Sequence, residues 1–293
     1  MKEMMSNKKT ILILVLPGIL LMLAGIIAPI ILSVAYSLTD MHGGVPGQFI
    51  GLTNYIQLFT KDGEFWISIL HAIILALCYI LLQHPLCMLF AIMLDKIGGK
   101  GEKVFRVMLF IPCVISVMVT SKMWINILNP TFGMLAKLLK SIGLSAWVTD
   151  WLSNPNTVLP AIIFIVMWQG FGNGMLIYYA GYKGVSEELL EAASLDGATG
   201  LKRFFHVTLP QMMPVVKVNM TLAIISAFKQ METVYLITNG GPGNRSQFIA
   251  NYLYSVAFKN TQYGYANAIS VVFIVICMTV TLIYNGAVNR AEG

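Results

Sequence analysis

The sequence predicts an all-α integral membrane protein with six transmembrane helices. Of its 293 residues, 57% are hydrophobic and only 11% are charged, whereas soluble domains carry about 25% charged residues. The apolar residues form long blocks, and a block of about 18 or more residues can cross a bilayer as a helix. The short alternating segments of a membrane barrel are absent. Helices are therefore expected, because a helix satisfies its backbone hydrogen bonds within its own segment in lipid.

Six apolar blocks define the expected spans, within a single transmembrane domain of residues 1–293. The first block is too long for the core of a signal peptide and ends without a small-residue cleavage site, so we expect it to be retained. Several blocks exceed one crossing, which predicts tilts or kinks. Prolines are tolerated in such spans because neighbouring helices replace the lost hydrogen bonds. The expected spans are 10–38, 66–94, 105–128, 158–182, 211–237 and 267–288, with Pro17, Pro29, Pro85 and Pro112 inside them.

Basic residues set the expected orientation, with both termini in the cytoplasm. Eleven Lys and Arg then lie inside and five outside, as the positive-inside rule requires. They are scattered over short loops without a basic stripe, which argues against nucleic-acid binding. On the outer side, Met134–Leu144 is interpreted as a helix lying flat at the interface or as a plain loop. The inside set is Lys2, Lys8, Lys9, Lys96, Lys100, Lys103, Arg106, Lys183, Lys202, Arg203 and Arg290, and the outside set is Lys61, Lys137, Lys140, Arg245 and Lys259.

The loop 183–210 between spans four and five is a long polar segment on the expected cytoplasmic side. Ser186 is expected to cap a helix with two acids in its first turn, and Gly197 to end it in the left-handed conformation. A second short helix then leads to Pro210 and Pro214. The residues alone leave two interpretations open, a docking element for another protein and an amphipathic helix on the inner leaflet. The expected docking contacts are Leu189, Leu190, Ala192, Ala193 and Leu195.

The spacing within this loop resembles the EAA loop of ABC-importer permeases. Glu-Ala-Ala, a glycine, an aliphatic residue and a Leu-Pro pair follow one another at the family's intervals. The resemblance implies the type I ABC-importer permease fold, in which the loop forms coupling helices that dock onto an ATPase subunit. The residues implied in ATPase coupling are Glu191, Ala192, Ala193, Asp196, Gly197, Leu209 and Pro210.

A second segment, Leu236–Phe258, resembles the Thr-x-Gly-Gly-Pro region of carbohydrate permeases. Glycines around a proline by themselves indicate only a tight, exposed turn. The resemblance is to the maltose-type first subunit of a two-permease pair, in the short six-helix form used for sugars and glycerol phosphate. It implies contact with a solute-binding protein at Gly240, Gly241 and Pro242. Further similar segments, which extend it over nearly the whole chain, are Phe49–Phe59, Phe105–Pro112, Asn129–Gly133 and Trp151–Gly172.

Spans four and five hold the residues expected along a substrate path. Aromatic faces stack on sugar rings and amides bind hydroxyl groups, while packing through small residues is the other interpretation. The resemblance implies two sugar-facing alanines where the family has serine and asparagine, which widens the cavity and argues against maltose itself. Lys229 and Glu232 are expected to pair on one helix face. The path residues are Trp168, Gln169, Gly170, Asn173, Ala223, Ala227 and Gln230.

The sequence lacks a GxxxxGK[ST] phosphate loop, so we expect a subunit that is not itself an enzyme. No cofactor is expected in this chain, and ATP and Mg²⁺ would be bound by partner ATPase subunits. No His, Cys and carboxylate cluster has metal-ligand spacing, and the cysteines lie inside apolar blocks without a disulfide framework. The cysteines are Cys78, Cys87, Cys113 and Cys277.

The resulting hypothesis is a permease subunit of a binding-protein-dependent ABC importer for sugars or oligosaccharides. It would work by alternating access in the bacterial cytoplasmic membrane, in contact with lipid. Its partners would be a second homologous permease, two ATPase subunits and an extracellular or periplasmic solute-binding protein. The nearer alternative is the same machinery for glycerol phosphate or another sugar phosphate. The remoter one is a secondary carrier or membrane scaffold, although a ladder of buried acids for proton coupling is missing.

Overall fold

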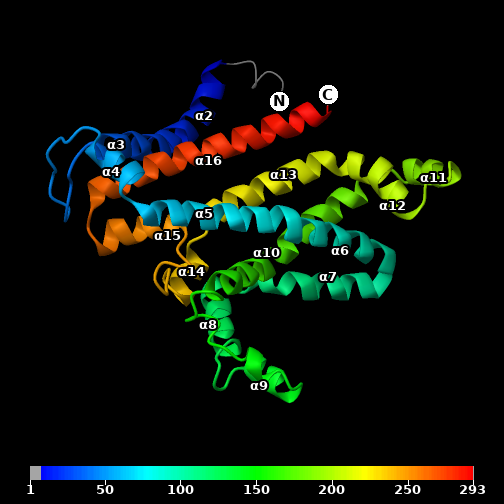
Figure 1. The fold of residues 1–293 in the computed structure, drawn as a ribbon. Coiled ribbons are helices and arrows are strands. Elements are labelled where there is room, and N and C mark those ends of the chain that lie inside the picture. The colour runs from blue at the N-terminus through cyan, green and yellow to red at the C-terminus, as the bar shows by residue number, and fades with distance from the viewer. Residues whose placement is uncertain (1–7, 293) are drawn as a thin grey trace. The chain divides into compact units, whose positions relative to one another are not determined.

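The computed structural model describes residues 8–292, and almost all of them are helical (Figure 1). Strand pairing among these residues is limited to two isolated bridges, so the predicted all-α class is confirmed. Lys2 of the expected cytoplasmic set lies outside the described residues. The helices are α2 (Lys8–Met22), α3 (Ala28–Ser37), α4 (Thr53–Thr60), α5 (Gly63–Cys78), α6 (His84–Ile97), α7 (Gly99–Val114), α8 (Val117–Ile127), α9 (Met134–Ser141), α10 (Val158–Lys183), α11 (Glu187–Leu195), α12 (Gly200–Arg203), α13 (Leu209–Phe228), α14 (Glu232–Ile237), α15 (Ile249–Tyr254) and α16 (Tyr263–Glu292). Short π-helical turns are η1 (Leu23–Ile27), η2 (Tyr79–Gln83), η4 (Phe204–Thr208) and η5 (Ser255–Lys259), and η3 (Ser145–Trp147) is a 3₁₀ turn.

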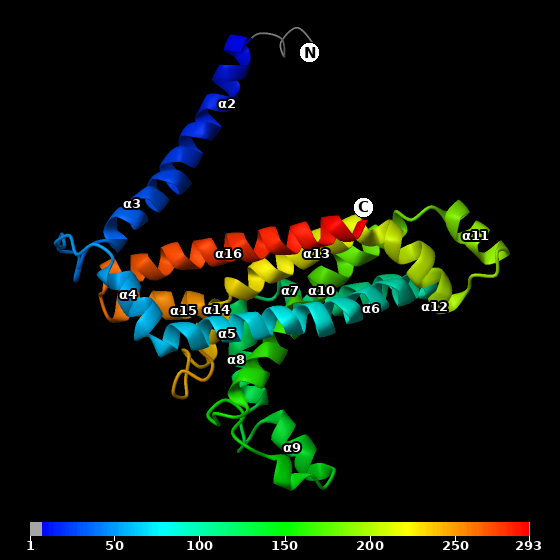
Figure 2. The ribbon, with the colours of Figure 1, turned by 45° about the horizontal axis from the view of Figure 1, so that its top comes forward.

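Five helical stretches in the described part of the chain are long and apolar enough to cross a membrane, and a bent pair adds a sixth if it counts as one span. The bent pair is α7 and α8, which meet at 97° (Figure 2). The expected span 105–128 is therefore not one continuous helix but a sharply bent pair, which agrees with the predicted kinks. Pro112 removes a backbone donor near the end of α7, and Ser116 starts the next helix by accepting a hydrogen bond from the Val119 N–H at 3.4 Å. The other stretches are Ile11–Ser37, Gly63–Ile97, Val158–Lys183, Gly200–Ile237 and Tyr263–Tyr284.

Three of the spans widen into a π-turn just before a proline. A proline cannot donate a hydrogen bond to the carbonyl four residues earlier, and its ring clashes with that carbonyl. In each case that carbonyl lies in the middle of the π-turn, and the residue before the proline donates to the carbonyl five residues back. The wider turn thus repairs the ladder within the helix itself. The prolines are Pro29, Pro85 and Pro210, after η1, η2 and η4.

The chain forms two compact units. Unit 1 is the described part of Met1–Gly63 together with Leu253–Ile276, and unit 2 is Glu64–Tyr252 with the described part of Cys277–Gly293. In unit 1 the buried Asn54 donates its amide to the carbonyls of Ser37 and Thr39, at 2.8 and 2.9 Å. The first span, by contrast, buries none of its apolar window. A helix that is apolar all round needs lipid or a partner helix to cover it. The prediction of a single domain stays a prediction.

The core of unit 2 lies where α10 packs between α6, α7 and α13. The buried side chains Cys87, Leu94, Met175, Tyr178 and Met212 belong to one apolar cluster there. Gly172 lets α10 approach α7 closely, because a Cβ at this position would lie 2.7 Å from the Phe110 Cα. These contacts hold α10 as the central element of unit 2.

Candidate functional site

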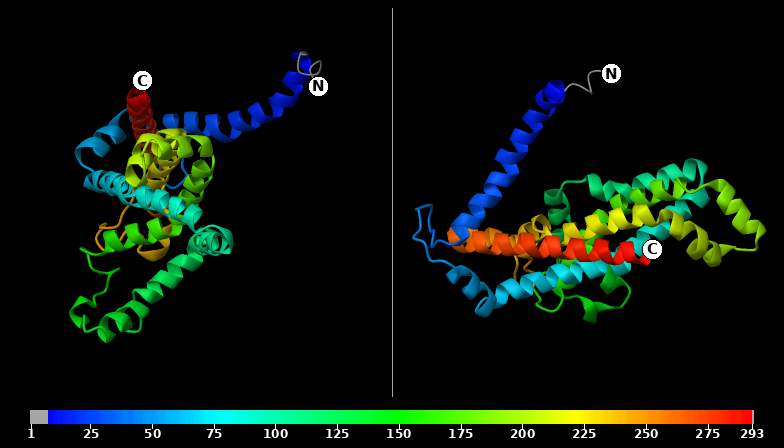
Figure 3. Two further views of the ribbon diagram at one scale, coloured as in Figure 1. Left: turned by 90° about the vertical axis from the view of Figure 1, so that its right-hand side faces the viewer. Right: turned by 90° about the horizontal axis from the view of Figure 1, so that it is seen from above.

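The first part of the candidate site is the hairpin of α11 and α12, which extends beyond the ends of α10 and α13 (Figures 1 and 3). The helix begins after Ser186 as predicted, but the Ser186 side chain makes no capping hydrogen bond. Gly197 has the expected left-handed conformation, with φ +76°. The Gly197 N–H donates to the Ser194 carbonyl at 3.1 Å and the Ala198 N–H to the Ala193 carbonyl at 2.8 Å. These two bonds form a Schellman motif, which sets the direction of the turn.

The second helix of the hairpin is not separate from the fifth span. Helical structure runs without interruption from Gly200 through η4 to Phe228, and it passes both Pro210 and Pro214. The helical stretch that contains the expected span 211–237 therefore begins earlier, at Gly200. The π-turn before Pro210 is the reason, because it absorbs the missing donor without ending the helix. α12, η4 and α13 therefore form one continuous helix.

The hairpin presents one face to the core of unit 2 and one to the outside. Ala193 is buried, and Leu190 packs against the core cluster. Of the two alanines expected as docking contacts, only Ala192 is therefore exposed, because Ala193 points inward. The side chains of Leu195 and Leu201 are 89% and 76% exposed. The exposed face thus carries leucines beside charged groups, and nothing in the described part of the chain covers these two leucines.

A shallow groove of about 450 Å³ runs along the hairpin. Glu187 and Glu191 lie on its α11 wall, and Arg203 faces them from α12. The Arg203 guanidinium donates to the Ser194 Oγ at 3.0 Å, which ties the two helices together. Asp196 is exposed at the turn. Of the remaining predicted coupling residues, Leu209 packs against the core cluster and Pro210 is exposed at the start of α13.

The second part of the candidate site is a pair of cavities beside α10. Cavity A, of about 180 Å³, is lined by Gly170, Asn173 and Ala223 of the predicted path. Cavity B, of about 280 Å³, is lined by Gln169, Gln230 and again Gly170. Because Gly170 lines both, the two cavities adjoin at this residue. The structure therefore brings five of the seven predicted path residues together.

The other two predicted path residues face elsewhere. Ala227 is completely buried, and the Trp168 ring packs edge-on against Trp124 with centroids 5.3 Å apart. Neither lines cavity A or cavity B. The Gln169 amide, which does line cavity B, donates to the Ile115 carbonyl at 3.2 Å and so supports the bend between α7 and α8.

Cavity A also contains polar residues that sequence reasoning did not place on a path. Gln83 and His84 are both hydrogen-bonded, Gln83 to the Met167 carbonyl at 3.0 Å and His84 to the Tyr178 hydroxyl at 2.7 Å, yet both line the cavity. Asn219 and Ser226 line it from α13. The polarity of these residues within apolar spans was the feature of the sequence that could have indicated a place on the path.

Lys229 and Glu232 do not share a helix face. Lys229 is the residue just after α13, Glu232 begins α14, and no ion pair joins them among the described residues. The prediction of a pair fails because the break interrupts the helical spacing that would align them. Both side chains instead line cavity B.

The third part is the loop of residues 238–247, here named the outer loop after its expected side of the membrane, and it is ordered by hydrogen bonds within the loop and to α5. The Ser246 Oγ donates to the Gly241 carbonyl at 2.6 Å, and the Asn244 amide donates to Glu64 at 2.5 Å. Gly240 is buried, while Gly241 and Pro242 are half-buried. The expected exposed turn is thus only partly exposed, because the loop folds back on itself. Asn239, Gly243 and Arg245 are its exposed residues.

We expect Gly240→Ala to destabilise the outer loop more than Gly243→Ala does. Both glycines have positive φ, but only at Gly240 would a Cβ collide with the Gln247 amide. Strain and overpacking together predict a cost of about 2–4 kcal/mol for Gly240→Ala and about 1 kcal/mol for Gly243→Ala. Thermal unfolding of the two purified variants measures the difference, and equal midpoints would contradict the loop geometry.

Comparison with known proteins decides the family. The sequence matches the family described as binding-protein-dependent transport system inner membrane component over residues 87–292. The chain belongs to this family. The permease matches, among others, the probable ABC transporter permease protein YurN of Bacillus subtilis, with 34% identity over 95% of this chain and 96% of that protein.

Further comparisons agree with this assignment. The multiple sugar-binding transport system permease protein MsmF of Streptococcus mutans is 31% identical to the permease over 85% of this chain and 84% of that protein. A crystal structure of a bacterial alginate ABC transporter, in complex with an alginate pentasaccharide-bound periplasmic protein, contains a chain of the same fold. Its TM-score is 0.86 at 22% identity, covering 99% of this chain and 97% of that one. The predicted ABC-importer permease fold is thereby confirmed.

Proposed function

We propose that this chain is the membrane-spanning permease subunit of a binding-protein-dependent ABC importer for neutral sugars or oligosaccharides. Solute passes through cavities A and B by alternating access. Cavity B is lined by Lys229 together with the carboxyl group of Glu232, so its one Lys is accompanied by an acid. The observation that carries the solute class is the lining of cavity A, which offers amide, hydroxyl and imidazole groups but no Lys, Arg or carboxylate. Such groups bind hydroxyls, whereas a phosphate calls for fixed cations. Relatives such as MsmF, named for sugar transport, support the same class.

The energy for transport comes from two partner ATPase subunits, which bind ATP and Mg²⁺. They dock on the hairpin, whose exposed Leu195 and Leu201 and flanking charges suit a protein groove better than water. A second homologous permease covers the exposed first span. The binding protein meets the outer loop, and both termini lie in the cytoplasm of a bacterium. The chain itself carries out no chemical step.

Uptake into proteoliposomes tests this function. The chain is reconstituted with its second permease, ATPase subunits and binding protein, and neutral oligosaccharides are compared with glycerol phosphate and sugar phosphates. We expect ATP-dependent uptake of a neutral sugar and none when the ATPase is omitted. Preferential uptake of a phosphate ester would overturn the solute class, and uptake without the ATPase would overturn the importer function.

Within this function, we expect Asn173→Leu to weaken solute uptake. Asn173 lines cavity A, and the substitution keeps its size but removes an amide that can hydrogen-bond a hydroxyl. Loss of one such bond costs about 1–1.5 kcal/mol, which corresponds to about a 5- to 12-fold higher half-saturating concentration. Asn173→Gln, which keeps the amide, should lose less. The half-saturating concentrations of the two variants are measured by uptake kinetics. An unchanged value for Asn173→Leu would mean that the solute path lies elsewhere.

A further inference from the structure

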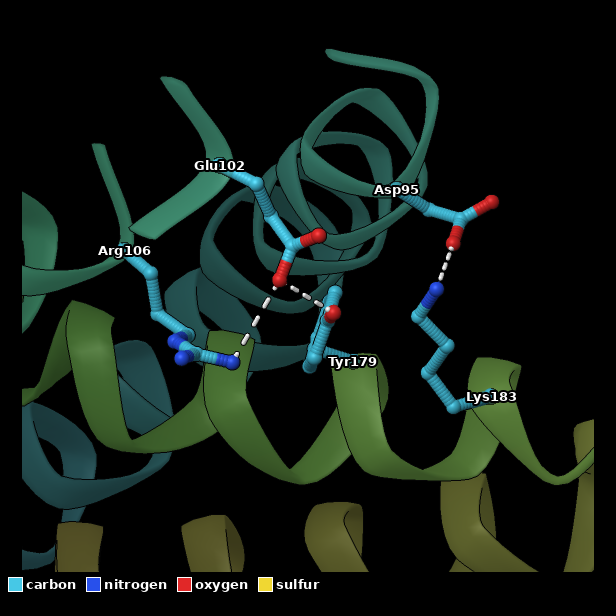
Figure 4. A network of polar contacts seen from close by, with 5 residues as sticks. All are labelled: Asp95, Glu102, Arg106, Tyr179 and Lys183. Atoms are coloured by element: carbon cyan, nitrogen blue, oxygen red, sulfur yellow. Dashed lines mark hydrogen bonds and ion pairs between the residues drawn. The ribbon is translucent and has the colours of Figure 1, made fainter. Parts of the chain in front are cut away.

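A cluster of polar contacts joins three helices where α10 ends (Figure 4). The Tyr179 hydroxyl donates to Glu102 Oε1 at 2.6 Å, and Arg106 Nη1 lies 3.4 Å from the same oxygen. Lys183 forms an ion pair with Asp95. The Arg106 guanidinium and the Lys183 ammonium lie 5.6 and 5.7 Å from the centre of the Tyr179 ring. We call these five residues the junction cluster.

The position of the junction cluster relates it to the hairpin. Asp95 belongs to the last turn of α6, and Glu102 to the first turn of α7, on either side of the tight turn at Gly98. Lys183 is the last residue of α10, and the first hairpin helix, α11, begins at Glu187. The cluster therefore ties the end of α10, next to the hairpin, to the turn between α6 and α7.

The charges of the junction cluster are not explained by stability alone. The Lys183 side chain is 50% exposed, and exposed ion pairs contribute little to folding. Packing already holds α10 against α6 through Met175 and Tyr178 in the core cluster. What the charged groups add is a defined contact between α7 and α10, since the Glu102 carboxylate, paired with Arg106 on α7, accepts the hydroxyl of Tyr179 from α10. Glu102, which is only 15% exposed, is the centre of this arrangement.

We propose that the junction cluster is the mechanical link that makes the α6–α7 turn move together with the hairpin. This inference rests on the proposed function, because it names how the docking stroke reaches the helices that line the cavities. His84 is the first residue of α6 and Gln83 lies just before it, and both line cavity A. A stroke carried from the hairpin into α6 through Asp95 therefore reaches the cavity wall. The five residues are positioning residues, since none lines cavity A or cavity B.

The test measures solute molecules taken up per ATP hydrolysed, in proteoliposomes of the complete complex. Lys183→Met and Asp95→Asn should each lower this ratio by about 3- to 10-fold, a coupling effect of ordinary size. The double variant Asp95→Lys with Lys183→Asp should restore it to within about twofold. Lys96→Met is the matched control. It removes one exposed charge from the same turn of α6, at a residue in no ion pair among those described.

The outcomes separate the two proposals. An unchanged ratio in both single variants, or failure of the charge exchange to restore it, overturns the link. A role in folding alone would lower the amount of assembled complex and leave the ratio per complex as in the wild type, which also overturns it. Where the charge variants do not assemble, the same ratio is measured for Tyr179→Phe, which removes only the hydroxyl bound to Glu102. A lowered ratio supports the link, and an unchanged ratio overturns it. Wild-type vesicles without ATP-driven uptake would instead overturn the proposed function.

Discussion

Gly197→Val is expected to lower both ATP-driven uptake and binding-protein-stimulated ATP hydrolysis by about tenfold or more. Gly197 has φ +76°, and no atom lies within 4 Å of the position of an added Cβ. The effect is therefore purely one of backbone conformation, for which an L-residue pays about 1–2 kcal/mol and a β-branched one more. Because the hairpin is exposed, this strain is relieved by unwinding the Schellman turn, and a difference of 1.4 kcal/mol is a factor of ten.

Gly197→Asn is the matched control for this prediction. Asparagine tolerates the left-handed conformation and is found at the same position of helix ends, so this variant should keep at least about half of the stimulated hydrolysis. The measurement is phosphate release by the reconstituted complex, with and without binding protein. If valine and asparagine behaved alike, the turn geometry would not be what transmits the stroke.

Gly172→Leu is expected to have the largest effect on stability, about 3 kcal/mol or more. A Cβ at Gly172 would lie 2.7 Å from the Phe110 Cα and also against the Leu109 carbonyl. These are backbone atoms, which cannot swing aside as a side chain does. The leucine therefore has to push α10 away from α7, and overpacking of this kind costs about 1–3 kcal/mol even when the intruding group is small.

The control for Gly172→Leu is Gly25→Leu, the same substitution in another apolar span. Gly25 has no atom within 4 Å of an added Cβ, so its leucine extends into open space. Thermal unfolding of the isolated subunit in detergent measures both variants, because the second permease is proposed to cover the first span in the complex. We expect a normal midpoint for Gly25→Leu and a strongly lowered one for Gly172→Leu, and similar midpoints would refute the close approach of α7 and α10.

The candidate site was partly accessible to sequence reasoning. Gly197 was predicted to end a helix because only special residues adopt φ > 0 there, and it does so. Five of the seven path residues line the two cavities, since helical spacing keeps Gln169, Gly170 and Asn173 close together. Ala227 and Trp168, by contrast, line neither cavity. In a helix that is apolar all round, the pattern does not tell which face meets a neighbour.

The sequence by itself determined the class of this protein, because long apolar blocks with so few charges can be satisfied only as membrane helices. It also determined the turn at Gly197 and the family, through motifs that are local in the chain. Only the tertiary structure decided the 97° bend between α7 and α8, the burial of Ala193 and Gly240, and the pairing of Asp95 with Lys183. These features depend on contacts between segments far apart in the sequence, and local propensity contains no information about such contacts.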